Sequence, residues 1–155
     1  MVLLEDTRNK EGKHKNVHEY CRRKGLEIVR KKLDVGDYML PDGNISVDTK
    51  EHLDELARNL MNRSDRSRFW REVRRARETG IVLIVLCEHG NPIRTINDVP
   101  KWKSRYSQIH GRRLLDEMIR LEMSYGIRWV FCDKRSTGKR IIELLTEEGT
   151  GDDAT

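Results

Sequence analysis

The sequence has no long apolar run and only three cysteines among its 155 residues. A membrane-spanning helix needs roughly 20 consecutive apolar residues, and no segment approaches that length. The N-terminal segment does not combine a basic stretch with a long apolar one, so we expect no signal peptide. These absences predict a cytoplasmic, intracellular protein that makes no contact with a membrane.

The cysteines Cys21, Cys87 and Cys132 lie far apart and form no Cys-x-x-Cys pair. Their odd number and spacing argue against a disulfide framework. Two of them lie in apolar segments. The pattern predicts buried, reduced thiols, as is usual in cytosolic proteins.

Charge, by contrast, is abundant. Lysine and arginine number 31 against 26 acidic residues, which gives a net charge of +5. The resulting pI of about 9.2 suits a polyanionic partner such as nucleic acid. Many domains without such a partner are equally basic, so charge alone does not decide the question.

Strand-like and helix-like segments alternate along the chain, which predicts an α/β protein with helices on both faces of a sheet. The predicted strands are residues 2–5, 26–33, 35–40, 44–50, 81–87 and 127–132. The predicted helices are residues 14–24, 52–79 with a break near 62–64, 111–125 and 137–147. A hairpin in the middle implies mixed strand directions. We expect a domain over residues 1–148, followed by a disordered acidic tail at 149–155.

The dipeptide Asp42-Gly43 lies between two alternating segments and is a strong signal for a tight hairpin turn. A two-residue turn here pairs Pro41 with Asn44, Leu40 with Ile45, Tyr38 with Val47, and Asp37 with Asp48. The apolar residues then share one face of the ribbon. Asp37, Asp48 and Lys50 share the other face.

Opposed carboxylates at this range, about 5 Å, repel each other unless they share a proton or bind a cation. Mg²⁺ or Mn²⁺ suits such a pair, because these ions take one or two carboxylates together with water and phosphate. Lys50 could orient or deprotonate the attacking water, or hold a phosphate oxygen. The alternative is the solvated outer face of an ordinary hairpin, and spacing alone does not exclude it.

Around these residues the sequence resembles the nuclease domain of the XPF-type structure-specific endonucleases, a branch of the PD-(D/E)xK nucleases. The family pattern is Gly-Asp, a gap, Glu-Arg-Lys, three residues and Asp; here it reads Gly36-Asp37, Asp48-Thr49-Lys50 and Asp54. Two further family elements correspond to Asp6-Thr7-Arg8 and Ser67-Arg68-Phe69. The resemblance covers nearly the whole chain in order.

The resemblance implies a restriction-endonuclease-like α/β/α fold with three layers and Mg²⁺-dependent hydrolysis of DNA, with branched or flap DNA as the expected substrate. Mn²⁺ is expected to substitute for Mg²⁺. The implied metal ligands are Asp6, Asp37 and Asp48. The implied catalytic set adds Lys50 and Asp54, together with Arg8 and Arg68 as holders of phosphate oxygens.

Three positions depart from the family pattern. Asp48 replaces the usual Glu, Thr49 the central Arg, and Asn9 the Glu that follows the first Arg. The superfamily allows Asp at the first position, whereas Thr49 removes a positive charge near the phosphate. Catalytic members also often have tandem helix-hairpin-helix domains, for which these 155 residues leave no room.

Between Arg58 and Arg77 there are eight arginines and only two acids. A helical projection places Phe69, Val73 and Ala76 on a buried stripe, with Trp70 at its boundary. We expect the outer arc to contact DNA phosphates through Arg71, Arg74 and Arg75. The alternative is a solvated arginine face with Trp70 packed at the edge of the core.

A second candidate DNA contact is the basic loop that contains Lys101, Lys103 and Arg105. Its alternative is a solvated loop with Trp102 packed inward. The histidines His18, His89 and His110 lack the spacing of metal ligands and receive no metal role.

Apolar residues cover more of the predicted helix 111–125 than one core contact needs. A second buried face, together with the resemblance, predicts a homodimer formed through the C-terminal helices.

The sequence therefore predicts a metal-dependent DNA endonuclease. A catalytically silent DNA-binding or scaffolding module that partners an active nuclease is the main alternative. A structural α/β protein without a nucleic-acid role remains if the motif match is accidental.

Overall fold

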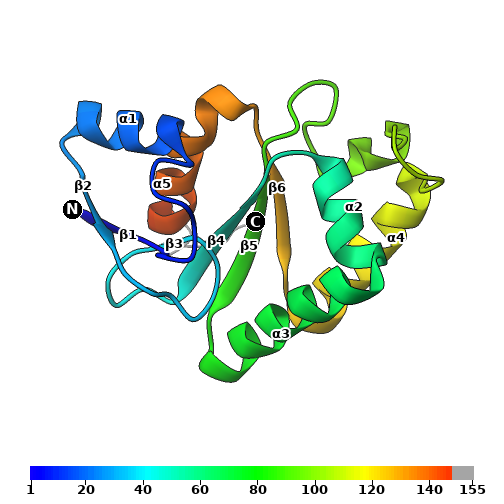
Figure 1. The fold of residues 1–155 in the computed structure, drawn as a ribbon, viewed down its shortest axis with the longest axis horizontal. Coiled ribbons are helices and arrows are strands. Elements are labelled where there is room, and N and C mark those ends of the chain that lie inside the picture. Colours follow the sequence, from blue (N-terminus) through cyan, green and yellow to red (C-terminus); the bar gives the residue numbers. More distant parts are fainter. Residues whose placement is uncertain (148–155) are drawn as a thin grey trace.

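The computed structural model describes residues 1–147 and contains a six-stranded mixed sheet with helices on both sides (Figure 1). The strands are β1 (Val2–Glu5), β2 (Glu27–Arg30), β3 (Tyr38–Met39), β4 (Ile45–Lys50), β5 (Val82–Cys87) and β6 (Arg128–Phe131). The helices are α1 (Lys15–Lys24), α2 (Leu53–Met61), α3 (Arg63–Thr79), α4 (Gly111–Tyr125) and α5 (Thr137–Glu147). Two short 3-10 helices are η1 (Ile96–Lys101) and η2 (Lys134–Ser136). The predicted acidic tail lies outside the described residues.

The strand order is β2-β1-β3-β4-β5-β6. Strand β3 is antiparallel to both of its neighbours, β1 and β4, whereas β4, β5 and β6 run parallel to one another. The predicted mixed sheet is confirmed. Because β4 and β5 are parallel neighbours, their carboxyl ends meet at the same edge of the sheet.

Helices α1 and α5 cover one face of the sheet, and α2, α3 and α4 cover the other (Figure 1). On the first face Val17 and Ile141 belong to a core that also contains Val47. On the second, Leu56 and Phe69 belong to a core that also contains residues of β5 and β6. The predicted three-layer α/β/α architecture is confirmed.

The predicted helices 111–125 and 137–147 have the bounds expected, and the long helical region does break, at Asn62 between α2 and α3. The predicted strand 26–33 ends at Arg30, and the predicted strand 35–40 shrinks to β3. The reason lies in the loop between them, where the backbone of Leu33 and Val35 bonds to side chains. Asp6 accepts the Leu33 N–H (2.8 Å), and Ser46 donates to the Val35 carbonyl (2.6 Å).

The hairpin turn differs from the prediction. The turn hydrogen bond joins the Gly43 N–H to the Leu40 carbonyl (3.0 Å), so Pro41 and Asp42 are its central residues. Asp42 supplies the positive φ, at 63°. The predicted pairing of Tyr38 with Val47 is nevertheless confirmed. A loop of four residues has one residue more on each side than the predicted two-residue turn. The residues of β3 and β4 therefore keep the same partners.

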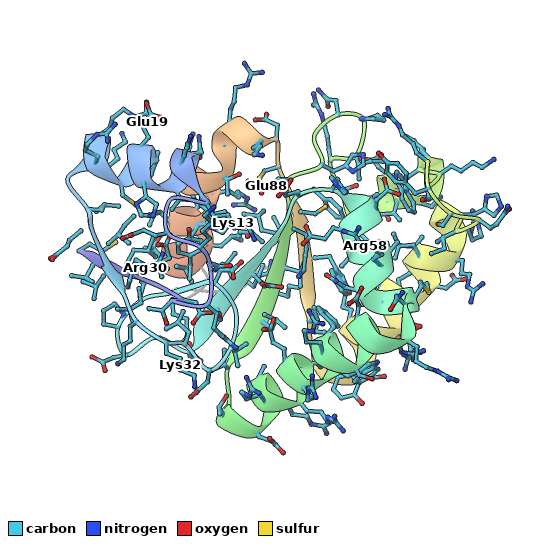
Figure 2. The ribbon with its side chains drawn as sticks, in the orientation of Figure 1. Lys13, Glu19, Arg30, Lys32, Arg58 and Glu88 are labelled. Atoms are coloured by element: carbon cyan, nitrogen blue, oxygen red, sulfur yellow. The ribbon has the colours of Figure 1, made fainter. Side chains whose placement is uncertain are left out.

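Charged side chains project from the outer surfaces of the helices, such as Glu19 on α1 and Arg58 on α2 (Figure 2). Among residues 1–147 no helix combines the length and the apolar character needed to cross a membrane. The cysteines are free; Cys21 and Cys87 are buried and Cys132 is partly exposed. Burial raises the pKa of the Cys87 thiol to about 12, which makes it a poor nucleophile.

Candidate active site

Gly36 directs the chain into β3 and thereby sets the position of the Asp37 side chain. Its φ is +71°, and a Cβ at this position would lie 2.1 Å from Ser46 Oγ. The next residue, Asp37, donates its N–H to the Val47 carbonyl (2.9 Å). The Gly-Asp sequence therefore has a steric cause, since a side chain at Gly36 would collide with β4.

Asp37 is buried, and donors surround its carboxylate. Oδ2 accepts hydrogen bonds from the Thr49 N–H (2.9 Å) and hydroxyl (2.8 Å), and Oδ1 accepts one from the Asn9 amide (2.6 Å). Burial opposes ionisation, but these donors hold the pKa of Asp37 below its usual value. Two positions that depart from the family pattern, Asn9 and Thr49, thus both serve to fix Asp37 as an anion.

Asp48, on β4, has the opposite environment. It is 6% exposed, and within the described residues its Oδ2 has no well-directed hydrogen bond, although Lys50 Nζ lies 3.1 Å away. Burial raises the pKa of Asp48 well above its usual value; the charges of Asp37 and Glu72 add to this, and Lys50 opposes it. Asp48 is therefore an under-compensated carboxyl group, that is, a buried acid whose negative charge the neighbouring residues balance only in part.

Lys50 holds its proton firmly. Burial disfavours its charge, but the carboxylates of Asp48 and Glu55 keep the pKa of Lys50 above its usual value. Its ammonium group can therefore donate hydrogen bonds at neutral pH. This state suits it to hold an anionic oxygen or to orient a water molecule rather than to accept a proton.

An acidic pocket of about 220 Å³ lies between β4 and the helices α2 and α3. Its lining residues are Asp48, Lys50, Glu55, Asn59, Asp65, Arg68, Phe69 and Glu72. Four carboxyl groups therefore face only two cations. The site thus has an excess of negative charge in a hollow large enough for an ion and part of a phosphate.

Glu72, which belongs to none of the sequence motifs, supplies one of these carboxyl groups from α3. It is half-buried and accepts a hydrogen bond from the Gly36 N–H. Burial raises the pKa of Glu72, and Asp37 adds to the effect while Lys50 opposes it. Helical spacing was the available signal, because Glu72 lies one turn after Arg68 and therefore on the same face of α3.

Asp6 and Arg8 lie beside this pocket and hold its framework together. Arg8 Nε pairs with Asp6 Oδ2 (2.7 Å), and Arg8 also donates to the Leu33 carbonyl (2.7 Å). The Asp6 N–H donates to the Asp37 carbonyl (2.9 Å). The Leu33 N–H occupies the other Asp6 oxygen, so two of the roughly four acceptor positions of this carboxylate are taken.

His14 links the site to the far side of the sheet, and no local pattern in the sequence signalled it. Tyr38 donates to Glu5 Oε2 (2.6 Å), and His14 Nδ1 lies 2.7 Å from the same hydroxyl. His14 Nε2 lies 3.1 Å from Thr49 Oγ1, which donates to Asp37. Tyr38, His14 and Thr49 therefore form a hydrogen-bond chain that runs from Glu5 to Asp37.

A divalent cation fits the acidic pocket. Within residues 1–147 no group of three or more His, Cys, Asp or Glu side chains forms a preassembled metal shell. Mg²⁺ does not need one, because it uses one or two carboxylates and fills the remaining positions with water and phosphate. The uncompensated Oδ2 of Asp48 and the nearby Asp37 and Glu72 are donors of the required kind.

Comparison with known families agrees with this geometry. Residues 6–145 match the model of the ERCC4 domain. The chain belongs to the ERCC4 domain family.

Among solved structures the ERCC4 domain is similar to XPF from Aeropyrum pernix, with a TM-score of 0.70 and 23% identity over 96% of this chain and 65% of that one. It is also similar to XPF from Aeropyrum pernix in complex with DNA, with a TM-score of 0.66 and 25% identity over 96% of this chain and 64% of that one. The chain thus spans less than two thirds of the XPF chains that it matches. Comparison with curated protein sequences gives no match. The predicted resemblance to the XPF nuclease domain is confirmed, together with its fold.

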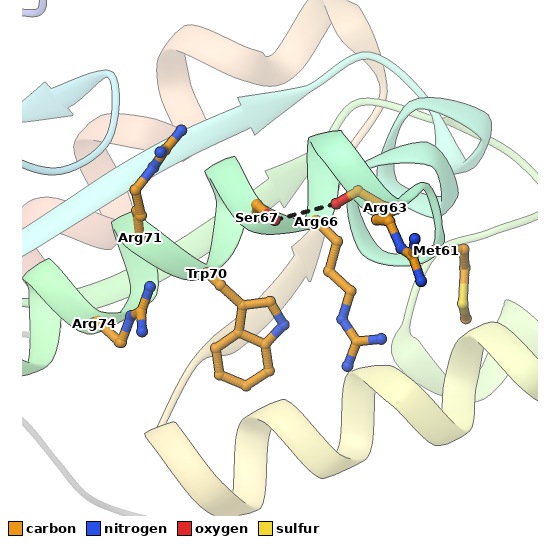
Figure 3. Close-up of a pocket in the computed structure, with 7 residues that line it drawn as sticks. All are labelled: Met61, Arg63, Arg66, Ser67, Trp70, Arg71 and Arg74. Carbon is orange, nitrogen blue, oxygen red and sulfur yellow. Dashed lines mark hydrogen bonds between the residues drawn. The ribbon is translucent and has the colours of Figure 1, made fainter.

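The predicted arginines of α3 in the ERCC4 domain lie on different faces of the helix. Arg68 lines the acidic pocket, with a side chain that is 76% exposed and only loosely paired to Asp65 at 3.9 Å. Arg71 and Arg74 instead line an arginine groove of about 630 Å³ (Figure 3). The residues that line this groove are Met61, Arg63, Arg66, Ser67, Trp70, Arg71 and Arg74. At 3.6 residues per turn, the two sets of residues project from opposite sides of the helix.

Trp70 belongs to the groove, but its ring is already engaged. Tyr125 packs edge-on against it with centroids 4.9 Å apart, and the Arg120 guanidinium lies 5.5 Å from its centroid. Its place at the edge of the core is as predicted, and the ring is not free to stack on a base. Arg75 donates to the Asp34 carbonyl (3.0 Å) and so also braces the loop before β3.

Asp54 and the basic loop lie outside the acidic pocket. Asp54 Oδ1 accepts a hydrogen bond from Ser104 (2.6 Å), which fixes the loop to the first turn of α2. Trp102 is 8% exposed, as the inward-packed alternative predicted. The loop's basic side chains are exposed: Lys101, Lys103 and Arg105.

Proposed function

We propose that this ERCC4 domain is a metal-dependent DNA endonuclease that hydrolyses phosphodiester bonds in branched or flap DNA, with Mg²⁺ as its cofactor and Mn²⁺ as a substitute. The observation that supports this best is the acidic pocket. Its carboxyl groups outnumber its cations, and the buried Asp48 Oδ2 has no well-directed donor. A divalent ion together with a phosphate would balance that charge.

In this proposal Asp48 and Asp37 hold the ion, with Glu72 as a further carboxylate. When bound, the ion supplies positive charge that acidifies water and offsets the charge that develops on the phosphate. Asp37 retains free lone pairs despite its hydrogen bonds, because a carboxylate can accept about four. The hydrogen bonds from Asn9 and Thr49 fix its orientation.

Lys50 donates from its ammonium group to a phosphate oxygen or to the attacking water. Arg68 has the exposure and the forked geometry to hold a second phosphate oxygen. Arg8 holds Asp6 in place and lies close enough to Glu72 to lower the pKa of that carboxyl group. The products would be a 5′-phosphate and a 3′-hydroxyl.

Other parts of the molecule would contact DNA away from the cleaved bond. Arg71 and Arg74 lie on the opposite side of α3 from the acidic pocket, so they would hold a different segment of the substrate. A branched DNA offers such a segment. The XPF relative captured with DNA is consistent with DNA as the ligand. An enzyme with this activity would also fit the intracellular localisation predicted from the sequence.

The second candidate is a catalytically silent DNA-binding module. Thr49 favours it, because the family's arginine is missing there. The buried, charge-rich pocket disfavours it, because a silent module has no need of such costly carboxyl groups.

An incision assay tests the proposal. Purified protein is incubated with flap, fork and duplex DNA in Mg²⁺ or Mn²⁺, beside Asp37→Asn, Asp48→Asn and the exposed control Asp116→Asn. We expect incision of the branched substrates, lost by about 100-fold or more in the first two variants and retained in the control. Binding without incision by the parent would instead establish the silent module.

A further inference from the structure

A second pocket lies at the N-terminus of α2. Strands β4 and β5 pair Lys50 with Cys87 at their carboxyl ends. His52 and His89 each follow two residues later, so the parallel register brings them to the same edge of the sheet. They line a histidine pocket of about 380 Å³, together with Asp54, Pro92, Ile93, Lys101, Trp102, Lys103, Arg105 and Tyr106.

Both histidines are held in one tautomer. The Leu53 N–H donates to His89 Nδ1 (3.0 Å), and the Glu55 N–H donates to His52 Nδ1 (3.2 Å). A nitrogen that accepts a hydrogen bond does not carry the proton, so each neutral ring carries its proton on Nε2. The pocket therefore contains two imidazole N–H donors.

The charge of the pocket is positive. Three cations, Lys101, Lys103 and Arg105, face one carboxylate, Asp54. Lys101 pairs with Asp98 (3.1 Å), whereas Lys103 and Arg105 form no ion pair with another described residue. The Ser104 hydroxyl binds Asp54 and fixes the loop in place. Donors and unpaired cations without a matching acid suit an anion such as phosphate.

An exposed aromatic ring stands beside this pocket. Tyr106 is 82% exposed, although Trp102 in the same loop is buried. An exposed ring beside a phosphate site is the arrangement that proteins use to stack an unpaired base. A base inside a duplex does not offer its face in this way.

The two pockets share a wall. Asp54 lines the histidine pocket and Glu55 lines the acidic pocket, and both lie in the first turn of α2. A helix with its side chains is about 10 Å across. One strand that crosses this helix can therefore reach both pockets with phosphates that lie a few nucleotides apart.

We propose that the histidine pocket binds the phosphate of an unpaired nucleotide close to the cleaved bond, with the base stacked on Tyr106. This inference rests on the proposed function for the identity of the strand. It adds a feature that the acidic pocket lacks, namely a preference for single-stranded DNA near the incision.

Fluorescence anisotropy with single-stranded and blunt duplex oligonucleotides in EDTA tests the proposal without metal or cleavage. The variant is Lys103→Gln/Arg105→Gln, and the control with the same charge loss is Arg22→Gln/Arg23→Gln on the exposed side of α1. We expect the variant to bind single strands about tenfold more weakly and to lose about 0.7 from the salt slope for each phosphate contact. Tyr106→Ala should weaken single-strand binding about tenfold and leave duplex binding unchanged.

A single strand with a 5′-phosphate is compared with one that ends in a hydroxyl. Tighter binding of the 5′-phosphorylated strand assigns the pocket to a terminal phosphate. Equal binding of the two strands assigns it to a phosphate of the backbone. Equal affinity of the variant and its control, or an equal loss for duplex and single strand after Tyr106→Ala, overturns the proposal. Asp48→Asn should keep its single-strand affinity even though it loses incision, so failure of this site and failure of the nuclease proposal are distinguishable.

Discussion

At the scale of single residues, the two central aspartates have opposite electrostatic environments. Asp37 accepts hydrogen bonds from Thr49 and Asn9, and its pKa falls. Asp48 has only Lys50 at ion-pair distance, and burial raises its pKa. The protein therefore keeps one carboxylate ready as an anion and leaves the other in need of a cation.

Replacing Asp48 by Asn should stabilise the metal-free protein. A raised carboxyl pKa means that the folded state binds a proton more tightly than the unfolded state, so stability falls as pH rises above the usual 3.8. The amide of Asn does not ionise, so the variant does not lose this stability as pH rises. At pH 8 without metal we expect the melting temperature to rise by about 2–4 °C for each kcal/mol regained.

Thermal unfolding of the parent, Asp48→Asn and Asp116→Asn between pH 5 and 8 measures this. The gain of Asp48→Asn should grow with pH, and the exposed control should show no such trend. A lower or unchanged melting temperature at pH 8 would contradict the assignment of Asp48 as an under-compensated carboxyl group.

The sequence could predict that Asp37 and Asp48 lie close together but not what surrounds them. The Gly-Asp and Asp-Thr-Lys segments are local signals, and β pairing placed them together. Asn9 and Thr49 donate to Asp37 from the loop before α1 and from β4, and His14 contacts Thr49. These roles depend on side-chain directions that no local pattern encodes. Thr49 was therefore regarded only as a lost charge, whereas it is a donor to Asp37.

At the scale of elements, Gly36 allows the segment that precedes β3 to pass close to β4. Gly36→Ala would add both a strained φ and a Cβ 2.1 Å from Ser46 Oγ. Gly25 offers a matched control, because its φ is +70° and its Cβ would meet nothing within 4 Å.

Gly25→Ala should cost about 1 kcal/mol from the backbone alone. We expect Gly36→Ala to cost roughly 1–3 kcal/mol more, because the neighbouring strand must move. Urea unfolding of the two variants measures the difference. Equal losses of unfolding free energy would show that contact with Ser46 does not restrict this position.

Helix α3 illustrates what periodicity can and cannot predict. Its buried stripe of Phe69, Val73 and Ala76 is as predicted, because spacing of three and four residues defines one face. The division of its polar surface into an acidic pocket and an arginine groove depends on which elements flank the helix. Helical spacing can therefore group Glu72 with Arg68, but it cannot show that Arg71 lines a different pocket.

At the scale of the whole molecule, the alternation of strands and helices was sufficient to predict three layers. The strand order was not predictable, since the insertion of β3 between β1 and β4 depends on the loop at residues 31–37. On the outer surface, α4 exposes two apolar side chains one turn apart. Ile119 is 40% exposed and Met123 is 82% exposed.

We expect this surface of α4 to form a homodimer, as proposed from the sequence. Light scattering at micromolar concentration should give the mass of a dimer for the parent and of a monomer for Met123→Glu. Val29→Glu, at another exposed apolar residue, is the control and should remain dimeric. A monomeric parent would rule out self-association through this helix.

The central claim is that the acidic pocket needs a divalent cation, and calorimetric titration of Mn²⁺ into the DNA-free protein tests it most directly. The account predicts saturable binding that strengthens as pH rises, because the raised pKa of Asp48 makes protons compete with the metal. Asp48→Asn should lose this binding and Asp116→Asn should retain it. Equal Mn²⁺ binding by the parent and Asp48→Asn, or none by either, would contradict the account.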